Sequence, residues 1–391
     1  MTPLIGNSQH IQKMNRLKVL NFIRNNPDTS RPVISRETGL ALSSITNITS
    51  YLLGAGLLTE SGTEEASRVG RKSTLLRFNA ERYSLVCISF EPKNIYVAHT
   101  DLNGNIAEKI CIESDNTLPE KSIGLLTERL LEMINRIGKD KILAIGISVS
   151  GLVLDGGRFV ASTSLRWKEF DIKAIVEKET GLPAFPENSS MLKAVWYFCC
   201  EKHAEYKNMV LVDLKNGIGS CQYYKGSINR AMLGEIGHTT VESNGEPCFC
   251  GNRGCLEAMC STGRITELYK KYSGYENADF DYVTGRFYLK DDDAVKAVTE
   301  CGKYLGIGLA NIVNMCKPSL VAINMGSFEK LPEITAIAEE EMRKRVYPAL
   351  LEDFVIEKIS VDYEQAVKGA AFNMCDRLFD MSAKFHNGFV I

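Results

Sequence analysis

The strongest chemical signal in the sequence is a cluster of four metal-ligand side chains. His238, Cys248, Cys250 and Cys255 fall within eighteen residues of one another. Imidazole and thiolate are ligands that zinc prefers, and three cysteines with one histidine fill all four positions of a closed tetrahedral site. No position is left for an activated water, so we expect a structural Zn²⁺ that fixes a loop. Free thiols that are merely close in sequence are the alternative.

The composition indicates the cellular compartment, and with it the redox state, of these cysteines. The chain has 391 residues, of which 45% are hydrophobic and 24% charged, as in a soluble protein of two or three domains. The first residues lack a signal-peptide pattern, and no apolar run approaches the roughly 18 to 20 residues of a membrane helix. We therefore expect a cytoplasmic protein without membrane insertion, whose twelve cysteines stay reduced.

The charge is distributed unevenly along the chain. The formal net charge is −2, yet residues 1–78 contain ten Lys or Arg against five acidic residues, a local charge of +5. A basic segment attached to an acidic body suits a polyanionic partner such as DNA.

This basic segment has the pattern of a helix-turn-helix. A first helical pattern stops before Pro27, and two further helices, over 31–38 and 42–53, flank a turn at Gly39. The last helix would bury its apolar side chains and expose short polar ones, which could reach base edges in the major groove. A solvated three-helix bundle is the alternative. The residues that we expect to contact DNA here are Arg36, Ser43, Ser44, Thr46, Asn47 and Ser50.

A β-wing is predicted after the third helix. A polar loop over 60–67 separates an apolar pair from a strand over 74–78. Arginines beside a glycine can enter a narrow minor groove, because the glycine lets the backbone come close. We therefore predict DNA contacts from Arg68, Arg71 and Lys72, with a solvated basic turn as the alternative. The winged helix-turn-helix domain would span residues 1–80.

The remainder of the chain alternates strands with helices, which predicts stacked α/β layers. Short apolar runs predict strands over 85–89, 95–100, 142–149, 209–214, 220–224 and 320–324. Amphipathic patterns predict helices over 123–137, 191–199 and 298–315.

The chain resembles the ROK family of repressors, open reading frames and sugar kinases. GEIGH at 234–238, CxCGxxGCLE at 248–257 and the preceding winged helix carry this resemblance, which covers essentially the whole chain. It implies an actin-like, hexokinase-like body of two α/β lobes over 81–391, with a sugar in the cleft and the metal segment at 238–255. His238 would then use one ring nitrogen for the metal and the other for a sugar hydroxyl. The implied sugar-binding residues are Asn188, Glu235, His238 and Glu257, with capping or solvated roles as the alternative for the first, second and last.

The motifs that transfer phosphate in the family's kinases are altered here. Their catalytic base lies in Glu-Asn-Asp, which is Glu187-Asn188-Ser189 in this chain, and a serine is no base near neutral pH. Their first phosphate loop, Asp-x-Gly-Gly-Thr, aligns with 89–93, and their second, Gly-Thr-Gly-Ile-Gly, with 215–219. A third glycine cluster is reduced to 324–326. These four departures imply a protein that is not an enzyme.

We therefore expect a transcriptional regulator, a repressor of carbohydrate genes, that binds double-stranded operator DNA and senses a sugar or sugar derivative. A homodimer or homotetramer would place two heads on half-sites about 34 Å or a multiple apart. In the cleft, Ser150-Gly151 replaces the family's Pro-Gly and Ser164 replaces Asn, which leaves the ligand's identity open. A regulator controlled by a protein partner with a vestigial cleft, and a residual sugar kinase, are the alternatives.

Overall fold

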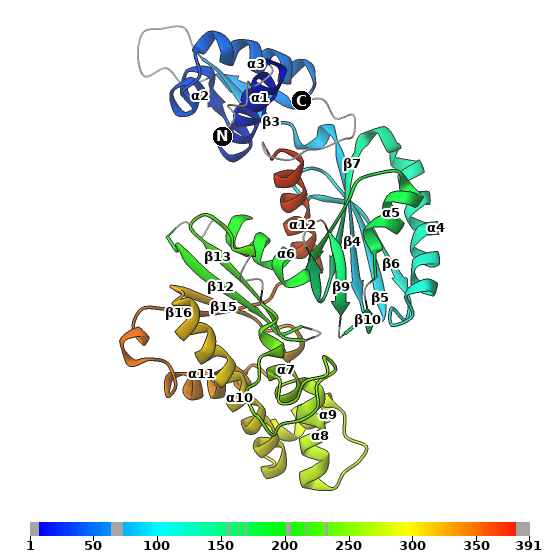
Figure 1. Cartoon of the computed structure of the whole chain (residues 1–391), viewed down its shortest axis with the longest axis vertical. Helices are drawn as coiled ribbons and strands as arrows, with labels where there is room; N and C mark the ends of the chain where they lie inside the picture. The colour runs from blue at the N-terminus through cyan, green and yellow to red at the C-terminus, as the bar shows by residue number, and fades with distance from the viewer. Residues whose placement is uncertain are drawn as a thin grey trace, which may run out of the picture.

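The protein, here as a computed structural model, has an N-terminal unit and a body with two lobes (Figure 1). The described residues are 8–63, 73–154, 157–162, 164–168, 170–200, 205–215, 217–230 and 234–380. No helix in these ranges combines the length and apolarity that a membrane crossing requires. Helices pack on sheets throughout, which confirms the predicted α/β class.

The N-terminal unit contains three helices and one small sheet. Its elements are α1 (Ser8–Asn25), β1 (Thr29–Ser30), α2 (Arg31–Thr38), α3 (Leu42–Gly54), β2 (Leu58–Thr63) and β3 (Thr74–Phe78). Gly39 has a left-handed backbone (φ 72°) and ends α2, while Ile45 and Ile48 of α3 are buried as predicted. β3 pairs with both β1 and β2, giving the winged arrangement. The loop predicted from residue 60 begins later, because β2 continues through Thr63.

The first lobe is built on a five-stranded sheet in the order β11-β7-β4-β5-β6. These strands are β4 (Ser84–Glu91), β5 (Asn94–Thr100), β6 (Ile106–Glu113), β7 (Ile142–Val149) and β11 (Ala184–Asn188). The helices α4 (Pro119–Ile137) and α5 (Ile172–Thr180) cover its outer face (Figure 1). Burial of Ile88 and Ile147 beneath Leu126 of α4 forms the core of this lobe. A small sheet follows β7, made of β8 (Leu152–Leu154), β9 (Arg158–Ser162) and β10 (Trp167–Lys168).

The second lobe has its own five-stranded sheet, in the order β14-β13-β12-β15-β16. These strands are β12 (Asn208–Asp213), β13 (Gly219–Tyr224), β14 (Ser227–Ile228), β15 (Leu320–Asn324) and β16 (Val355–Ile359). Its helices are α7 (Leu256–Met259), α8 (Thr262–Ser273), α9 (Phe280–Tyr288), α10 (Asp292–Cys316) and α11 (Glu333–Arg343). Short 3-10 helices also occur among the described residues of both lobes: η1 (Ala80–Arg82), η2 (Lys139–Lys141), η5 (Ile236–His238), η6 (Gly326–Phe328) and η7 (Pro348–Leu350). The strands and helices predicted for the body all overlap observed elements, although α4 and α10 begin four and six residues before their predicted starts at 123 and 298.

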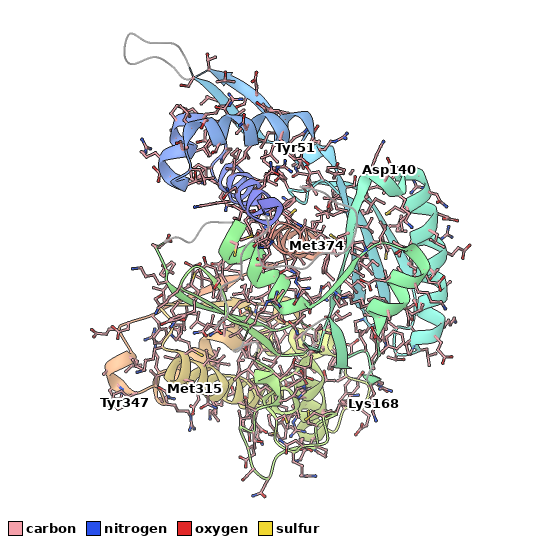
Figure 2. The ribbon with its side chains drawn as sticks, turned by 45° about the horizontal axis from the view of Figure 1, so that its top comes forward. Tyr51, Asp140, Lys168, Met315, Tyr347 and Met374 are labelled. Atoms are coloured by element: carbon pink, nitrogen blue, oxygen red, sulfur yellow. The ribbon has the colours of Figure 1, made fainter. Side chains whose placement is uncertain are left out.

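Two helices lie between the sheets of the two lobes (Figure 1). They are α6 (Ser189–Val195), which continues as a π-helix over Trp196–Cys200, and α12 (Tyr363–Leu378). At Gly369 of α12 an added Cβ would lie 2.0 Å from the carbonyl oxygen of Leu192 in α6, so the two helices touch backbone to backbone. Met374 of α12 is buried at the centre of the molecule (Figure 2), where it fills the space above Gly146 of β7.

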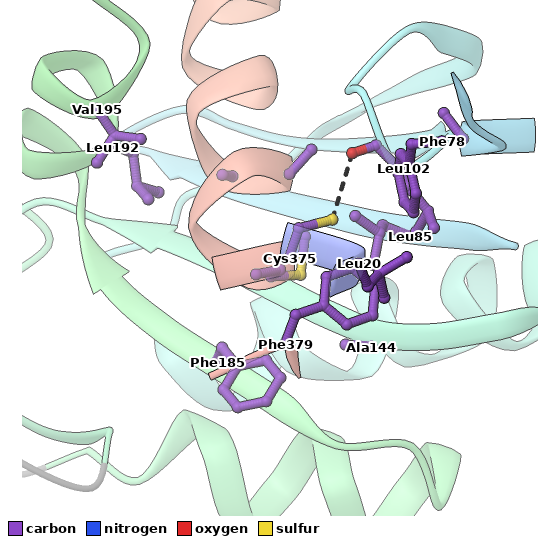
Figure 3. Packing of buried hydrophobic residues seen from close by; sticks show 14 of the residues in the cluster. Leu20, Phe78, Leu85, Leu102, Ala144, Phe185, Leu192, Val195, Cys375 and Phe379 are labelled. Carbon is purple, nitrogen blue, oxygen red and sulfur yellow. Dashed lines mark hydrogen bonds between the residues drawn. The ribbon is translucent and has the colours of Figure 1, made fainter. Parts of the chain in front are cut away.

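The end of α12 reaches the N-terminal unit. Arg24 of α1 forms an ion pair with Asp376, and the side-chain amide of Asn21 donates to the carbonyl of Phe379 at 2.9 Å. One hydrophobic cluster extends from α1 through Phe379 into the body (Figure 3), where Cys375 Sγ also donates to the Leu102 carbonyl at 3.3 Å. The N-terminal unit therefore shares a core with the helix that lies between the lobes.

Candidate metal centre and ligand cleft

His238 and three cysteines come together in the segment that leads from η5 into α7. His238 Nδ1 lies 3.5 Å from Cys248 Sγ, and Cys250 Sγ lies 3.7 Å from Cys255 Sγ. All four ligand atoms lie within 4.8 Å of one another. A tetrahedral zinc ion would hold two sulfur atoms about 3.8 Å apart, and a nitrogen and a sulfur atom about 3.6 Å apart. The four side chains therefore fit a tetrahedral metal ion.

The backbone of this segment is shaped to present the ligands. Gly254 has φ 66°, and a Cβ there would lie 1.6 Å from the Glu242 carbonyl oxygen, so only glycine fits before Cys255. The amide of Cys248 donates to the Asn252 carbonyl at 2.8 Å, which closes the turn. Burial raises the pKa of the Cys255 thiol to about 12, so a bound metal has to displace its proton.

The ring of His238 connects this cluster to a pocket. With Nδ1 turned toward Cys248, Nε2 lies 4.0 Å from Glu235 Oε2, and both residues line a cavity of about 510 Å³. Burial raises the pKa of the Glu235 carboxyl, and the nearby carboxylate of Glu257 acts in the same direction. One ring nitrogen thus faces the cysteines, while the other faces the pocket wall.

The opposite wall of this pocket comes from the first lobe, from the loop after β7 and from β9 and β10. Ser162 of this wall forms a hydroxyl cluster with Ser150 and Ser164, whose Oγ atoms lie 3.4 Å and 3.3 Å from its own Oγ. The hydroxyls of Ser150 and Ser164 also bond to each other. The two residues that depart from the family pattern therefore lie in contact. Sequence spacing gave no sign of this cluster beyond the substitutions themselves.

Two of the predicted sugar ligands do not line this pocket. Asn188 caps α6 by accepting from the Met191 amide at 3.1 Å, and it donates to the Gly151 carbonyl at 2.8 Å. Glu257 accepts from the amide of Ile218 at 3.0 Å and lines an adjoining cavity of about 630 Å³, which shares Arg166 and Phe249 with the first. Asn188 holds Gly151, a residue of the pocket wall, in place. Its geometry therefore supports an indirect effect on ligand binding. Direct sugar contacts by these two side chains stay predictions.

Comparisons with known proteins identify the fold and the family. The model of the ROK family matches residues 85–376. The chain belongs to the ROK family. It is 26% identical over 382 residues to the xylose repressor of Bacillus subtilis, covering 96% of this chain and 99% of that protein. A solved ROK transcriptional regulator, a homolog of the E. coli MLC protein, has a TM-score of 0.80 and 24% identity over 95% of this chain and 98% of its own. The ROK hexokinase of Thermus thermophilus has a TM-score of 0.60 and 23% identity, over 74% of this chain and 97% of its own.

The ROK body is thus the two-lobed fold that this family shares with hexokinases, and its phosphate-binding positions differ here. Glu91, in the first of these loops, forms an ion pair with Lys215 in the second, with 3.1 Å between Oε1 and Nζ. The amide of Ile218, also in the second loop, is bonded to Glu257. In this ROK chain, groups at both aligned loop positions are therefore bonded to other groups of the protein.

A buried ion pair that sequence reasoning missed lies beside the second loop of this ROK body. Lys193 of α6 and Asp213 of β12 are 2.6 Å apart, and their side chains are only 6% and 1% exposed. Ser190 and Asn324 also donate to the same carboxylate, at 2.9 and 2.7 Å. A desolvated pair persists only when such extra bonds satisfy it, so this network ties α6 to the sheet of the second lobe.

The N-terminal unit of this ROK protein exposes the polar face of α3. All six predicted contacts of the helix-turn-helix are exposed, although Arg36 pairs with Glu37 at 2.8 Å, and the Thr46 hydroxyl donates to the Leu42 carbonyl at 2.9 Å. Their contact with DNA stays a prediction. The predicted wing residues Arg68, Arg71 and Lys72 lie outside the described residues.

Proposed function

We propose that this chain is a DNA-binding transcriptional repressor of carbohydrate genes, which binds a sugar or sugar derivative in its cleft without phosphorylating it. One observation carries the proposal. A helix-turn-helix with an exposed polar recognition face packs directly on a ROK body whose two phosphate loops are joined by Glu91 and Lys215. The first half of this combination serves DNA recognition, and the second half removes phosphate transfer.

In this account, residues 1–80 form the DNA-binding domain and 81–391 the sensing domain. Recognition helix α3 enters the major groove, where serine, threonine and asparagine side chains reach base edges. The wing arginines and Lys72 follow the adjacent minor groove. Two such heads in a homodimer, or a homotetramer, engage the two halves of an operator. A protein that binds chromosomal DNA works in the cytoplasm of a bacterium.

The metal that we assign to the cluster is Zn²⁺ in a structural role. Zinc supplies the cross-link that holds the segment from His238 to Cys255 in one conformation. This segment begins at His238, which lines the pocket together with Glu235, and imidazole and carboxylate groups there can bond to adjacent sugar hydroxyls. The chain's own residues therefore bind and orient the ligand, and the metal segment keeps them in place.

We propose no catalysis, because the groups that phosphate transfer requires are replaced or are bonded to other groups of the chain. Ser189 stands where a kinase needs a carboxylate to take the hydroxyl proton. Glu91 adds a negative charge where a triphosphate would have to approach, and it already pairs with Lys215. Protein-bound carboxylates in this position repel a polyanion and leave no cradle for it.

A series of contacts connects the cleft to the N-terminal unit that we propose to bind DNA. Asn188 bonds to the pocket-wall residue Gly151 and caps α6, which packs on α12, and α12 ends against α1. A ligand that draws the lobes together would move α6 and α12, and with them the attachment of the N-terminal unit. The ligand shifts operator affinity only by as much as it prefers one of the two arrangements.

Selection from a random-sequence duplex library tests the DNA half of the proposal. The full chain should enrich a two-part, roughly palindromic site, and the enriched duplex should then bind with strong salt dependence. A variant that keeps the fold but lacks recognition side chains, Thr46→Ala with Asn47→Ala, should enrich nothing in common with the wild type. If the wild type enriches no motif, the regulator proposal is wrong.

Incubation with ATP, Mg²⁺ and a sugar panel tests the absence of kinase activity. Sugar-dependent ATP turnover that disappears in a Glu235→Gln variant would show a residual sugar kinase. We expect turnover at the level of a buffer blank for pentoses, hexoses and amino sugars alike.

A further inference from the structure

The two walls of the pocket have opposite chemical character. Glu235, His238 and the metal ligands belong to the second lobe, whereas Arg166 and Lys168 of the first lobe line the same 510 Å³ cavity. Glu235 is the one carboxylate among the described residues that line it. Hydroxyl-binding groups therefore face a wall that carries two positive charges.

The two cations lie at the start of β10. Lys168 belongs to this strand and Arg166 directly precedes it, and both line the pocket together with Trp167. The Trp167 ring is buried in the first lobe, 5.0 Å from the ring of Phe90, and both cations are exposed on the cleft side. Figure 2 labels Lys168 at the lower edge of the first lobe, beside the second lobe.

Arg166 adopts a backbone conformation that is unfavourable for its residue type. Its φ of 56° lies in the left-handed region, where glycine would cost less. Strain of this kind is found at binding sites, where the side chain is needed. The guanidinium lies 5.6 Å from the ring of Phe249, which is 81% exposed and stands between two of the metal ligands. The contact joins the first lobe to the metal segment across the cleft.

Glu235, the one carboxylate among the described lining residues, lies 4.0 Å from His238 Nε2 and forms no ion pair with either cation. Hydrogen bonds from Thr117 are the main cause of the lowered pKa of Asp115, to which the charge of Arg166 makes a smaller contribution. Asp115 does not line the pocket. The charge on the cleft side is thus available to a ligand.

We propose that the ligand of this cleft is a carbohydrate with an anionic group, a phosphate or a carboxylate, which Arg166 and Lys168 bind while its hydroxyls face Glu235 and His238. This inference rests on the proposed sugar sensing and names its ligand class. The guanidinium offers a planar pair of donors to either anion, and the ammonium adds a point charge. Ser189, in place of the kinase carboxylate, removes a negative charge from the start of α6.

Calorimetry on the full metal-loaded chain tests the proposal with matched probes. The probes are glucose, glucose 6-phosphate and glucuronate; N-acetylglucosamine and its 6-phosphate; xylose and its 5-phosphate; and inorganic phosphate alone. We expect a charged member to bind about tenfold to a hundredfold more tightly than its neutral partner, as charge-assisted bonds allow. That preference should shrink as salt rises. Comparison of phosphate with carboxylate members identifies the anion.

Variants assign the preference to the two cations. Arg166→Gln and Lys168→Gln should each reduce the ratio of charged to neutral affinity severalfold, and the double variant should abolish it. Lys178→Gln, an exposed lysine on α5 away from the pocket, is the matched control and should leave the ratio unchanged. Glu235→Gln should weaken charged and neutral members alike, because it faces the hydroxyls.

Three outcomes overturn the inference. The neutral member of a pair could bind at least as tightly as its charged form, the cation variants could leave the ratio unchanged, or inorganic phosphate could match the phosphosugar. Each of these leaves sugar sensing intact. Absence of binding by every carbohydrate in the panel would overturn both this inference and the proposed sugar sensing.

Discussion

The ring of Phe78, the last residue of β3, packs edge to face on the ring of Phe379, with centroids 6.1 Å apart. Phe379 follows the end of α12 and is fully buried. The contact joins the sheet of the N-terminal unit to the helix that lies between the two lobes. The N-terminal unit is therefore attached through a shared core rather than through a linker alone.

Truncation of this contact should loosen the attachment. Phe379→Ala removes a fully buried ring and should lower the free energy of unfolding by about 3–5 kcal/mol. Urea denaturation followed by circular dichroism measures the loss. Tyr347→Ala, at a position that is 67% exposed, is the control and should change stability by less than about 0.5 kcal/mol. A loss below about 1 kcal/mol for Phe379→Ala would contradict a shared core.

The recognition face predicts selective effects on DNA binding. Asn47 is exposed on α3, and its loss should cost about 1–3 kcal/mol on the preferred duplex, as for a base contact. Binding to random duplex, which depends on phosphate contacts, should change little. Fluorescence anisotropy with both duplexes gives the two affinities. Asn103→Ala, in an exposed turn of the body, should alter neither, and equal losses on both duplexes for Asn47→Ala would argue against base contacts.

The ion pair between Glu91 and Lys215 predicts that exchanging the two charges restores stability. Glu91→Lys places two positive charges together at the phosphate loops and should lower the melting temperature, whereas Glu91→Lys with Lys215→Glu should recover most of the loss. Both side chains are partly exposed, so the coupling should be no more than about 1 kcal/mol. Thermal unfolding of the four proteins in a double-mutant cycle measures it. Additive effects would show that the pair does not hold the loops together.

The metal cluster predicts a local role. One zinc ion per chain should be found by elemental analysis, and Cys255→Ser should lose it. Removal of the metal should weaken sugar binding about tenfold or more, because the segment that carries His238 loses its cross-link. Stability of the first lobe should be largely retained, since its core contains none of the four ligands. Cys111→Ser, at an exposed cysteine of β6, is the control. Wild-type protein without metal that binds sugar normally would rule out this role.

The sequence predicted what local patterns control. The turn at Gly39, the buried face of α3 and the cluster of His238 with three cysteines all follow from residue types at short spacing, and the structure has them there. The start of α10 was predicted six residues late, although Asp291 is a recognisable cap that accepts from the Ala294 amide.

Contacts between distant parts of the chain could not be predicted in the same way. Glu91 and Lys215 are 124 residues apart, and Lys193 and Asp213 meet only because α6 packs on the second sheet. The side chain of Asn188 looks free in the sequence, yet the cap of α6 and the Gly151 carbonyl use it. Such pairings depend on how whole elements pack, which no short window of residues encodes.

Under the proposed function, a carbohydrate occupies the cleft and its occupancy changes DNA binding. Anisotropy of the preferred duplex, titrated with the full chain in the absence and presence of pentoses, hexoses, amino sugars and their phosphates, tests it most directly. We predict that at least one of these shifts the operator Kd fivefold or more, as for a coupling of about 1 kcal/mol or greater. The shift should disappear in Glu235→Gln. A Kd that no carbohydrate changes would contradict the account.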